Sequence, residues 1–201
     1  MRVLVTGAEG MVGKVLVDKL VENNIDVVAS VYPGKTGILK DIQSEFFKKV
    51  EADITGVFWD DLLKDVTHVV HLAAMVHVHE REKQIWEDFY KVNVTATQNL
   101  CRAAKRTGIK KFFFVSTVGV HGDFPLEDAN GNLIIRPNSF YAESKLKAEE
   151  VVIKELSGII PFVIFRPVML YGLGDRGNMG RMIEAIRKGR FVIPGSGKNK
   201  K

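Results

Sequence analysis

A tyrosine and a lysine four residues apart are the side chains of this sequence best suited to moving a proton. Tyr141 and Lys145 lie at the start of an expected helix near residues 139–157, with Pro137 just before it. The i,i+4 spacing puts the phenol and the ammonium on one face of that helix. A free tyrosine has a pKa of about 10, and a neighbouring cation lowers that pKa toward neutral pH. The pair therefore indicates a tyrosine acid–base catalyst; the alternative is an exposed Tyr and Lys on a helix flank.

Two hydroxyl residues, Ser116 and Thr117, follow the apolar run Phe112–Val115, which has the pattern of a buried strand. A parallel strand that ends there places both hydroxyls at the edge of the sheet where ligands bind. Thr117 precedes Tyr141 by 24 residues, and its hydroxyl could hold a substrate oxygen beside the phenol. Taken separately, the two residues are more typical of strand-end caps.

A glycine-rich turn follows the first apolar run of the chain and leads directly into an amphipathic segment. Gly7 permits the tight turn, Gly10 lets a pyrophosphate approach the backbone, and Gly13 lets helix and strand pack closely. The N-terminus of the helix adds unpaired N–H groups and a partial positive charge, which attract phosphate. In this strand–turn–helix context the three glycines indicate dinucleotide binding rather than a purely structural turn.

The end of the second expected strand bears on the choice between NAD and NADP. An Asp or Glu about 20 residues beyond the glycine turn would bind the ribose 2′-hydroxyl, but no acid occurs between Asp26 and Asp41. This absence removes a repulsion against a 2′-phosphate, and Lys35, just after Tyr32, could reach one. The expected cofactor is therefore NAD or NADP, with a slight preference for NADP. Asp53, at the end of the third strand, could accept from the adenine amino group or simply cap a loop.

Short apolar runs alternate with helical patterns along most of the chain. Runs that are apolar on both faces suit parallel strands covered by helices on each side, and the alternation predicts βαβ units. The expected fold is a doubly wound, Rossmann-type α/β sheet with helices on both faces and the carboxyl ends of its strands at one edge. The expected strands are Val3–Val5, Val27–Val31, Phe46–Val50, His68–Leu72, Lys111–Ser116 and Ile160–Phe165.

Composition excludes several classes of protein. The chain has 201 residues, of which 46% are hydrophobic and 26% charged, so it is neither a disordered nor a collagen-like protein nor a multi-pass membrane protein. Cys101, the single cysteine, is expected in the core and agrees with a reducing compartment. With neither a signal peptide nor an apolar stretch of about 20 residues, the protein is expected to be soluble and cytoplasmic, with no membrane partner.

Charge and histidine placement argue against nucleic-acid and metal partners. Residues 176–201 carry a net charge of +7 and residues 1–175 carry −2. A basic segment confined to the end of the chain supports nucleic-acid binding only weakly, and a solvated helix face with a lysine-rich end is favoured. The alternating histidines of the segment His77-Val78-His79-Glu80 could share one metal ion, but a third ligand at a useful spacing is not evident, so no metal site is expected.

The order of these motifs resembles that of the extended short-chain dehydrogenase/reductases, and most closely the NAD-dependent epimerase/dehydratase family. The resemblance covers essentially the whole chain. It rests on Gly7/Gly10/Gly13, His71-Leu72-Ala73-Ala74, Asn93-Val94, Ser116-Thr117, Tyr141-Ala142-Glu143-Ser144-Lys145 and Arg166-Pro167…Tyr171-Gly172.

The resemblance implies a role for each residue of the site. Tyr141 would be the catalytic acid/base, Lys145 would lower its pKa and hold the nicotinamide ribose, and Thr117 would orient the substrate. Asn93 would support the site structurally. The full expected cofactor-binding set is Gly7, Gly10, Met11, Val12, Gly13, Tyr32, Lys35, Asp53, Ile54, Leu72, Ala73, Ala74, Ser116, Tyr141, Lys145, Arg166 and Pro167.

Departures from the family pattern limit what is implied about the substrate. Dehydratases of the family carry an acid right after the catalytic threonine, whereas Val118 follows Thr117 here, so 4,6-dehydration is disfavoured. His121 stands where a tyrosine is usual. Members of the family run on beyond this length, so residues 1–175 are expected to form the NAD(P)-binding domain and residues 176–201 the start of a truncated substrate-binding lobe.

The function that these features predict is hydride transfer at a hydroxyl of a nucleotide sugar, by an NAD(P)-dependent oxidoreductase or isomerase with Tyr141 as acid/base. One alternative is an NADPH-dependent ketone reductase or alcohol dehydrogenase, and another is a non-catalytic dinucleotide-binding module. The expected partner is a small-molecule substrate, and the resemblance also implies a homodimer.

Overall fold

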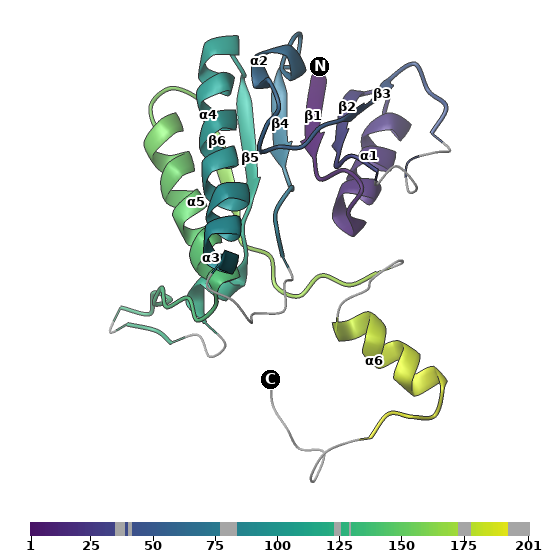
Figure 1. Cartoon of the computed structure of the whole chain (residues 1–201), viewed down its shortest axis with the longest axis vertical. Coiled ribbons are helices and arrows are strands. Elements are labelled where there is room, and N and C mark those ends of the chain that lie inside the picture. The colour runs from purple at the N-terminus through teal and green to yellow at the C-terminus, as the bar shows by residue number, and fades with distance from the viewer. Residues whose placement is uncertain are drawn as a thin grey trace. The chain divides into compact units, whose positions relative to one another are not determined.

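Six apolar runs form strands, and all of them pair in parallel in one sheet (Figure 1). The spatial order β3-β2-β1-β4-β5-β6 reverses between β1 and β4, as it does in a doubly wound Rossmann-type sheet. The predicted fold class is therefore confirmed. The strands are β1 (Arg2–Thr6), β2 (Asp26–Val31), β3 (Phe47–Glu51), β4 (His68–His71), β5 (Lys111–Val115) and β6 (Phe162–Phe165).

This computed structural model describes residues 1–34, 39, 42–76, 84–122, 126–128, 130–172 and 178–192. The chain divides into two units, Met1–Val168 and Met169–Lys201. The first unit holds the whole sheet, and the second holds α6 (Asn178–Arg187). The expected assignment of residues 176–201 to a substrate-binding lobe stays a prediction. None of the described helices is long and apolar enough to cross a membrane.

Helices cover both faces of the sheet, because alternate residues of each strand face opposite sides. Val3 and Val5 of β1 join Val17 in a core beneath α1 (Met11–Glu22), whereas Leu4 joins a second core. That second core lies beneath α2 (Trp59–Leu62), α4 (Ala96–Thr107) and α5 (Phe140–Leu156), and it includes the fully buried Cys101. Burial on both faces explains why β1 and β2 read as apolar runs, whereas the edge strands β3 and β6 keep exposed residues.

Helix α5, which carries the tyrosine–lysine pair, begins and ends where the sequence predicts. Its N-cap is Ser139, whose Oγ accepts a hydrogen bond of 3.2 Å from the N–H of Ala142, and its last residue precedes Ser157. The apolar side of the helix buries Ala148 and Val152 in the second core. Capping and packing together fix which residues of α5 face the sheet.

The long helical stretch before β5 contains a turn that its sequence does not reveal. Between α3 (Gln84–Phe89) and α4, residues Tyr90–Thr95 form a π-helical turn. Such turns are rare and frequently occur at functional sites. The turn holds Asn93, which is 1% exposed, so its side-chain amide is buried in the first unit.

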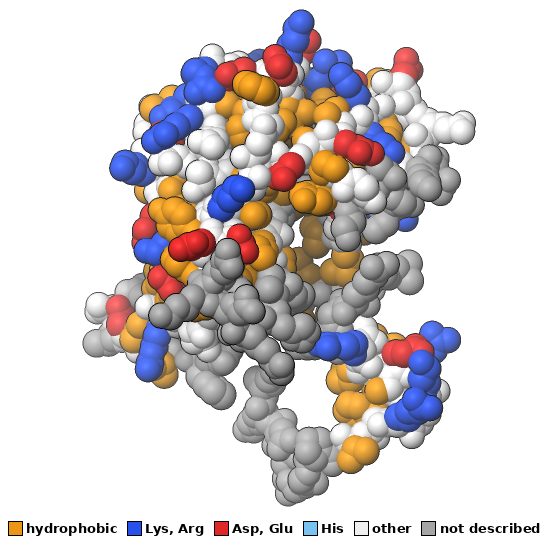
Figure 2. All heavy atoms as spheres, viewed as in Figure 1, with side chains coloured by type: hydrophobic (Ala, Val, Ile, Leu, Met, Phe, Trp, Pro, Cys, Tyr) orange, Lys and Arg blue, Asp and Glu red, His pale blue; other side chains and the backbone are white. Residues whose placement is uncertain are grey.

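Acidic and basic side chains are interspersed on the face of the first unit that carries α4 (Figure 2). Arg106 of α4 bonds to both carboxylate oxygens of Asp60 in α2, at 3.0 and 2.9 Å. Arg102 and Lys105 both bond to Glu155 of α5. These bases are therefore neutralised by acids of neighbouring helices.

Candidate active site

The glycine turn after β1 packs so tightly that side chains are excluded from it. Gly7 has a φ of +68°, and a Cβ on it would lie 2.8 Å from the backbone nitrogen of Ala73. A Cβ on Gly13 would lie 2.3 Å from the carbonyl oxygen of Gly7. The N-cap of α1 is Gly10, so no side chain caps the first N–H groups of the helix. This glycine cradle fits a pyrophosphate, which needs close approach to backbone N–H groups.

The segment after β4 lies beside the cradle, as the resemblance implies. The N–H of Ala73 donates to Oγ1 of Thr6 at 3.2 Å, and the N–H of Leu72 donates to the carbonyl oxygen of Thr6 at 3.2 Å. Ala73 and Ala74 are half-buried. Met11 and Val12, also in the predicted cofactor set, form the first turn of α1.

Three other predicted cofactor residues follow β2 and β3. Tyr32 is half-exposed, and its N–H donates to Oε1 of Glu9 at 3.2 Å. Asp53 uses Oδ1 to accept from the N–H of Thr55 at 2.9 Å and from its hydroxyl at 2.8 Å, so it caps its own turn. Ile54 packs in the second core. Among these three residues, Asp53 has the loop-capping role that was considered as the alternative to binding the adenine amino group.

Two buried polar atoms near the carboxyl ends of the strands have no hydrogen-bond partner in the described part of the chain. They are Oε2 of Glu9, in the glycine cradle, and Oγ of Ser116, directly after β5. Buried polar groups are nearly always hydrogen-bonded in folded proteins. A polar ligand along this edge of the sheet would supply partners to both, so the residues present fit a bound dinucleotide.

The tyrosine–lysine pair is held near β5 by Lys145, and Asn93 connects its helix to the segment after β4. Lys145 is 2% exposed, and its Nζ lies 4.1 Å from the ring centroid of Phe114 in β5. Ser144, between the two residues in sequence, accepts from Nδ2 of Asn93 at 2.9 Å. The same amide donates to the carbonyl oxygen of Met75, just after β4, at 3.1 Å.

Burial, rather than mutual attraction, dominates the electrostatics of the pair. Burial raises the pKa of Tyr141, and burial lowers the pKa of Lys145 to about 7. The sequence analysis expected the lysine cation to lower the pKa of the tyrosine, and the chain by itself does not show that effect. The reason is that both groups leave water in an apolar setting, where the neutral forms are favoured.

Glu149 continues the buried face of α5 one turn beyond Lys145. It is 2% exposed, and its charge raises the pKa of Lys145 against the larger effect of burial. Arg166, just after β6, donates to both of its carboxylate oxygens, from Nε at 3.0 Å and from Nη2 at 2.6 Å. Arg166 was expected to bind the cofactor, which stays a prediction, and in the structure its guanidinium pairs with this carboxylate. Pro167, expected in the same role, accepts from the N–H of Val118 through its carbonyl oxygen at 3.0 Å.

His121, which departs from the family pattern, lies on the other side of Arg166. Nη1 of Arg166 is 3.1 Å from Nε2 of His121, and Nδ1 of His121 is 3.1 Å from the carbonyl oxygen of Ile134. Because a guanidinium only donates, Nε2 accepts in this contact and Nδ1 donates to the carbonyl oxygen. His121 therefore links Arg166 to the segment that holds Ile134.

Thr117 caps a short 3₁₀-helix, Val118–His121. Its Oγ1 accepts from the N–H of Gly119 at 3.1 Å. This bond does not use the hydroxyl hydrogen of Thr117, so that hydrogen can be donated to a substrate oxygen. The capping role considered for Thr117 and the substrate-orienting role are therefore compatible.

A chain of hydrogen bonds connects β1 with α5 through the interior. Thr6 donates to Nδ1 of His71 at 2.7 Å, Nε2 of His71 donates to Thr97 at 2.9 Å, and Thr97 donates to the carbonyl oxygen of Asn93 at 2.7 Å. The Asn93 side chain then donates to Ser144. These directions follow because Thr97 uses its only hydrogen on the Asn93 carbonyl. Burial lowers the pKa of His71 to about 3 and keeps it neutral.

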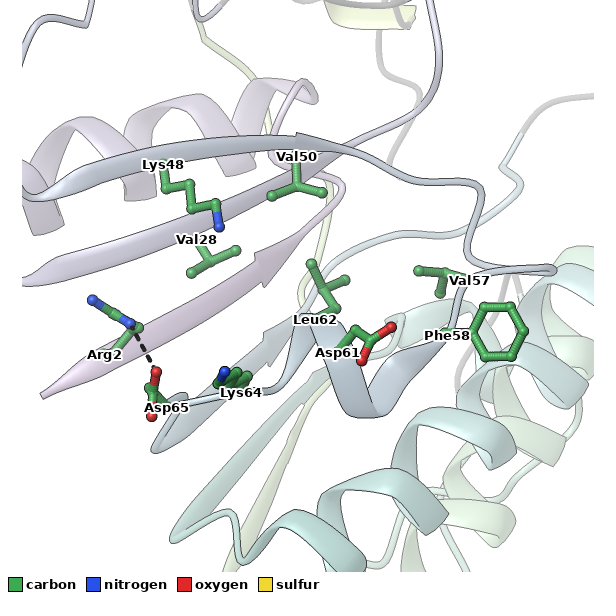
Figure 3. A pocket seen from close by; sticks show the side chains of 10 residues that line it. All are labelled: Arg2, Val28, Lys48, Val50, Val57, Phe58, Asp61, Leu62, Lys64 and Asp65. Atoms are coloured by element: carbon green, nitrogen blue, oxygen red, sulfur yellow. Dashed lines mark ion pairs between the residues drawn. The ribbon is translucent and has the colours of Figure 1, made fainter.

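A hollow of about 340 Å³ lies elsewhere in the first unit, between α2 and strands β1 to β3 (Figure 3). Arg2, at the amino end of β1, forms an ion pair of 3.7 Å with Asp65 at its rim. None of the predicted site residues lines this hollow. It is therefore separate from the candidate site.

Some predictions fall on residues that the structure does not describe. Lys35, the group expected near a 2′-phosphate, lies outside the described residues, as do His77, His79 and Glu80. Within the described ranges, no group of three or more His, Cys, Asp or Glu side chains could hold a metal ion.

Glu9 and Glu149 were not expected from the sequence to lie near the candidate site, and His71 was named only within the family motif. Glu149 carried a readable signal, because it follows Lys145 by one helical turn on the same face. Glu9 carried none, since its neighbour Tyr32 is 23 residues away in the chain.

Comparison with known proteins gives one family and several relatives. A sequence model of the NAD dependent epimerase/dehydratase family matches residues 3–201. The UDP-glucose 4-epimerase of Vibrio cholerae is 30% identical over 196 residues, covering 93% of this chain and 57% of that protein. The 2-alkyl-3-oxoalkanoate reductase of Stenotrophomonas maltophilia is 28% identical over 214 residues, covering 100% of this chain and 60% of that protein.

Solved structures show the same likeness. The crystal structure of UDP-glucuronic acid 4-epimerase from Bacillus cereus, in complex with UDP-glucuronic acid and NAD, superposes with a TM-score of 0.82 at 30% sequence identity. The match covers 94% of this chain and 63% of that one. The chain thus spans 57–63% of the length of these three relatives.

Proposed function

Because this chain belongs to the NAD-dependent epimerase/dehydratase family, we propose that it binds a nicotinamide dinucleotide and epimerises a secondary hydroxyl carbon of a nucleotide sugar. Tyr141 is the acid/base in this proposal. The observation that carries it is the placement of Tyr141 and Lys145 one turn apart on α5, with Lys145 against Phe114 of β5, the strand that is followed by a Ser116 hydroxyl with no partner among the described residues.

Each side chain has a defined task in this proposal. The glycine cradle and the α1 N-terminus hold the pyrophosphate, and Lys145 holds a ribose hydroxyl. Tyr141 accepts the proton of the substrate hydroxyl at its phenolic oxygen and later returns it, while Thr117 donates its O–H to the same substrate oxygen. A bound oxidised nicotinamide would supply the hydride acceptor and would return the hydride to the opposite face of the resulting ketone, and its positive charge would favour the phenolate.

The nucleotide-sugar substrate is supported by what the relatives act on. The Vibrio cholerae relative is a UDP-glucose 4-epimerase, and the Bacillus cereus structure holds UDP-glucuronic acid together with NAD. Dehydration is disfavoured because Val118, rather than an acid, follows Thr117. UDP-glucose and UDP-glucuronic acid are accordingly the first substrates to test.

The experiment is an epimerisation assay on both UDP-sugars with added NAD, comparing the wild type with Tyr141→Phe. We expect the variant to lose at least about 100-fold in kcat, because the proton transfer loses its donor and acceptor. The matched control is Tyr90→Phe, which removes the hydroxyl of a half-exposed tyrosine in the π-helical turn and should retain activity. Unchanged turnover in Tyr141→Phe would end the catalytic assignment.

Reduction of a carbonyl compound is a second candidate, favoured by the alignment of the Stenotrophomonas maltophilia reductase over the whole chain. The same Tyr141 would then deliver a proton to the carbonyl oxygen. Oxidation of NADH or NADPH with 3-oxo substrates, without UDP-sugar turnover, would favour this reading. Tight nucleotide binding with neither activity would favour the non-catalytic module.

A further inference from the structure

Glu9 occupies the place where an acidic residue at the end of β2 would act. The glycine cradle passes over the carboxyl end of β2, since the N–H of Ala8 donates to the carbonyl oxygen of Ser30 at 3.2 Å. Tyr32, the first residue after β2, donates its N–H to Oε1 of Glu9 at 3.2 Å. A carboxylate therefore lies against the end of β2, although it comes from the turn after β1.

The second carboxylate oxygen of Glu9 lacks the hydrogen-bond partner that its first oxygen has. Oε2 is buried and has no partner among the described residues, and an unsatisfied buried acceptor is costly. The group expected beside it is a hydrogen-bond donor. An anion there would instead meet the carboxylate charge at close range.

We infer that Glu9 accepts from the adenosine ribose of the cofactor and selects NAD over NADP, an inference that rests on the proposed function. In Rossmann-type folds the ribose 2′-hydroxyl lies at the end of β2, next to the pyrophosphate cradle. That hydroxyl donates to Oε2, whereas a 2′-phosphate is repelled. The sequence preference for NADP rested on the absence of an acid between Asp26 and Asp41, and Glu9 supplies that acid from another element.

The test measures binding alone. Dissociation constants of NAD and NADP are determined by calorimetry for the wild type, Glu9→Gln and Glu22→Gln. Glu22 is an exposed acid at the far end of α1, so its substitution removes the same charge away from the cradle. We expect the wild type and Glu22→Gln to bind NAD at least about tenfold more tightly than NADP, and Glu9→Gln to lose most of that preference.

A second ligand tests the hydrogen bond without relying on the variant. NAD that lacks the adenosine 2′-hydroxyl should bind the wild type about tenfold more weakly than NAD. In Glu9→Gln, removal of the 2′-hydroxyl from NAD should weaken binding by a smaller factor than in the wild type.

The outcomes separate this inference from the proposed function. A wild type that prefers NADP, or a preference for NAD that Glu9→Gln leaves unchanged, overturns the role of Glu9 and leaves the proposed function standing. Failure of the wild type to bind either dinucleotide overturns both.

Discussion

Glu149 lies one helical turn beyond Lys145 on the buried face of α5 and holds the guanidinium of Arg166 through both of its carboxylate oxygens. Its charge opposes the effect of burial on Lys145 and raises the pKa of that lysine. Charges therefore alternate from Lys145 to Glu149 to Arg166. The cationic form of Lys145, which would stabilise a phenolate in the proposed function, is therefore favoured by a carboxylate two turns away from Tyr141.

Replacing Glu149 by Gln should destabilise the protein by about 1–3 kcal/mol, because Arg166, whose side chain is 33% exposed, then loses its carboxylate partner. Adding Arg166→Met in the same chain should recover part of this loss, since both charges are then gone. Urea unfolding at neutral pH measures both values.

The control for this prediction is Arg102→Gln, which breaks the pair with Glu155 at a position where the arginine is half-exposed. We expect a cost of about 0–1 kcal/mol. If Glu149→Gln lowers the free energy of unfolding no more than this control does, the pair of Glu149 and Arg166 does not stabilise the fold as predicted.

Lys145 should make the free energy of unfolding rise between pH 7 and pH 9. The folded pKa is about 7 and the ordinary value is 10.5, so in this range the unfolded chain keeps a proton that the folded chain has lost. Stability then increases with pH, by at most about 1.4 kcal/mol per pH unit. Above this range Cys101 and Tyr141, whose pKa values burial raises, act in the opposite sense.

Denaturant midpoints at pH 7, 8 and 9 measure that slope. Lys145→Met should abolish most of it, whereas Lys154→Met, at an exposed position of the same helix, should preserve it. A wild type whose stability is flat over this range would contradict the burial of an ionisable Lys145.

Gly13→Ala should destabilise the fold by about 1–3 kcal/mol, because the new Cβ would lie 2.3 Å from the carbonyl oxygen of Gly7. Nucleotide binding should weaken as well, since the cradle must open. Gly56→Ala is the matched control, because no atom lies within 4 Å of a Cβ at that position. Thermal unfolding and NAD titration of the two variants test this, and equal behaviour would contradict the tight packing of the cradle.

The elements that hold the site could be predicted from local sequence. The inner strands β1 and β2 appear as apolar runs because both of their faces are covered, and α5 is delimited by Ser139 and Ser157. The glycine spacing has one steric explanation, which the distances at Gly7 and Gly13 bear out. The periodicity of apolar residues and simple steric rules are enough to predict features that depend on residues close together in the chain.

The electrostatics of the site could not be predicted, because they arise between distant segments. The depth at which Tyr141 and Lys145 are buried depends on packing against β5. The acid at the end of β2 comes from Glu9, whose bond to Tyr32 joins residues 23 apart. The π-helical turn at Asn93 leaves no apolar repeat, so the amide facing α5 was expected only from the family resemblance.

The hydrogen-bonded series Thr6–His71–Thr97–Asn93–Ser144 has a mechanical consequence. Every donor in it points the same way, and each link spans a different element. Shifting β1 relative to α5 would break several of these buried hydrogen bonds. The glycine turn that follows β1 and the helix that carries Tyr141 and Lys145 are therefore expected to move together.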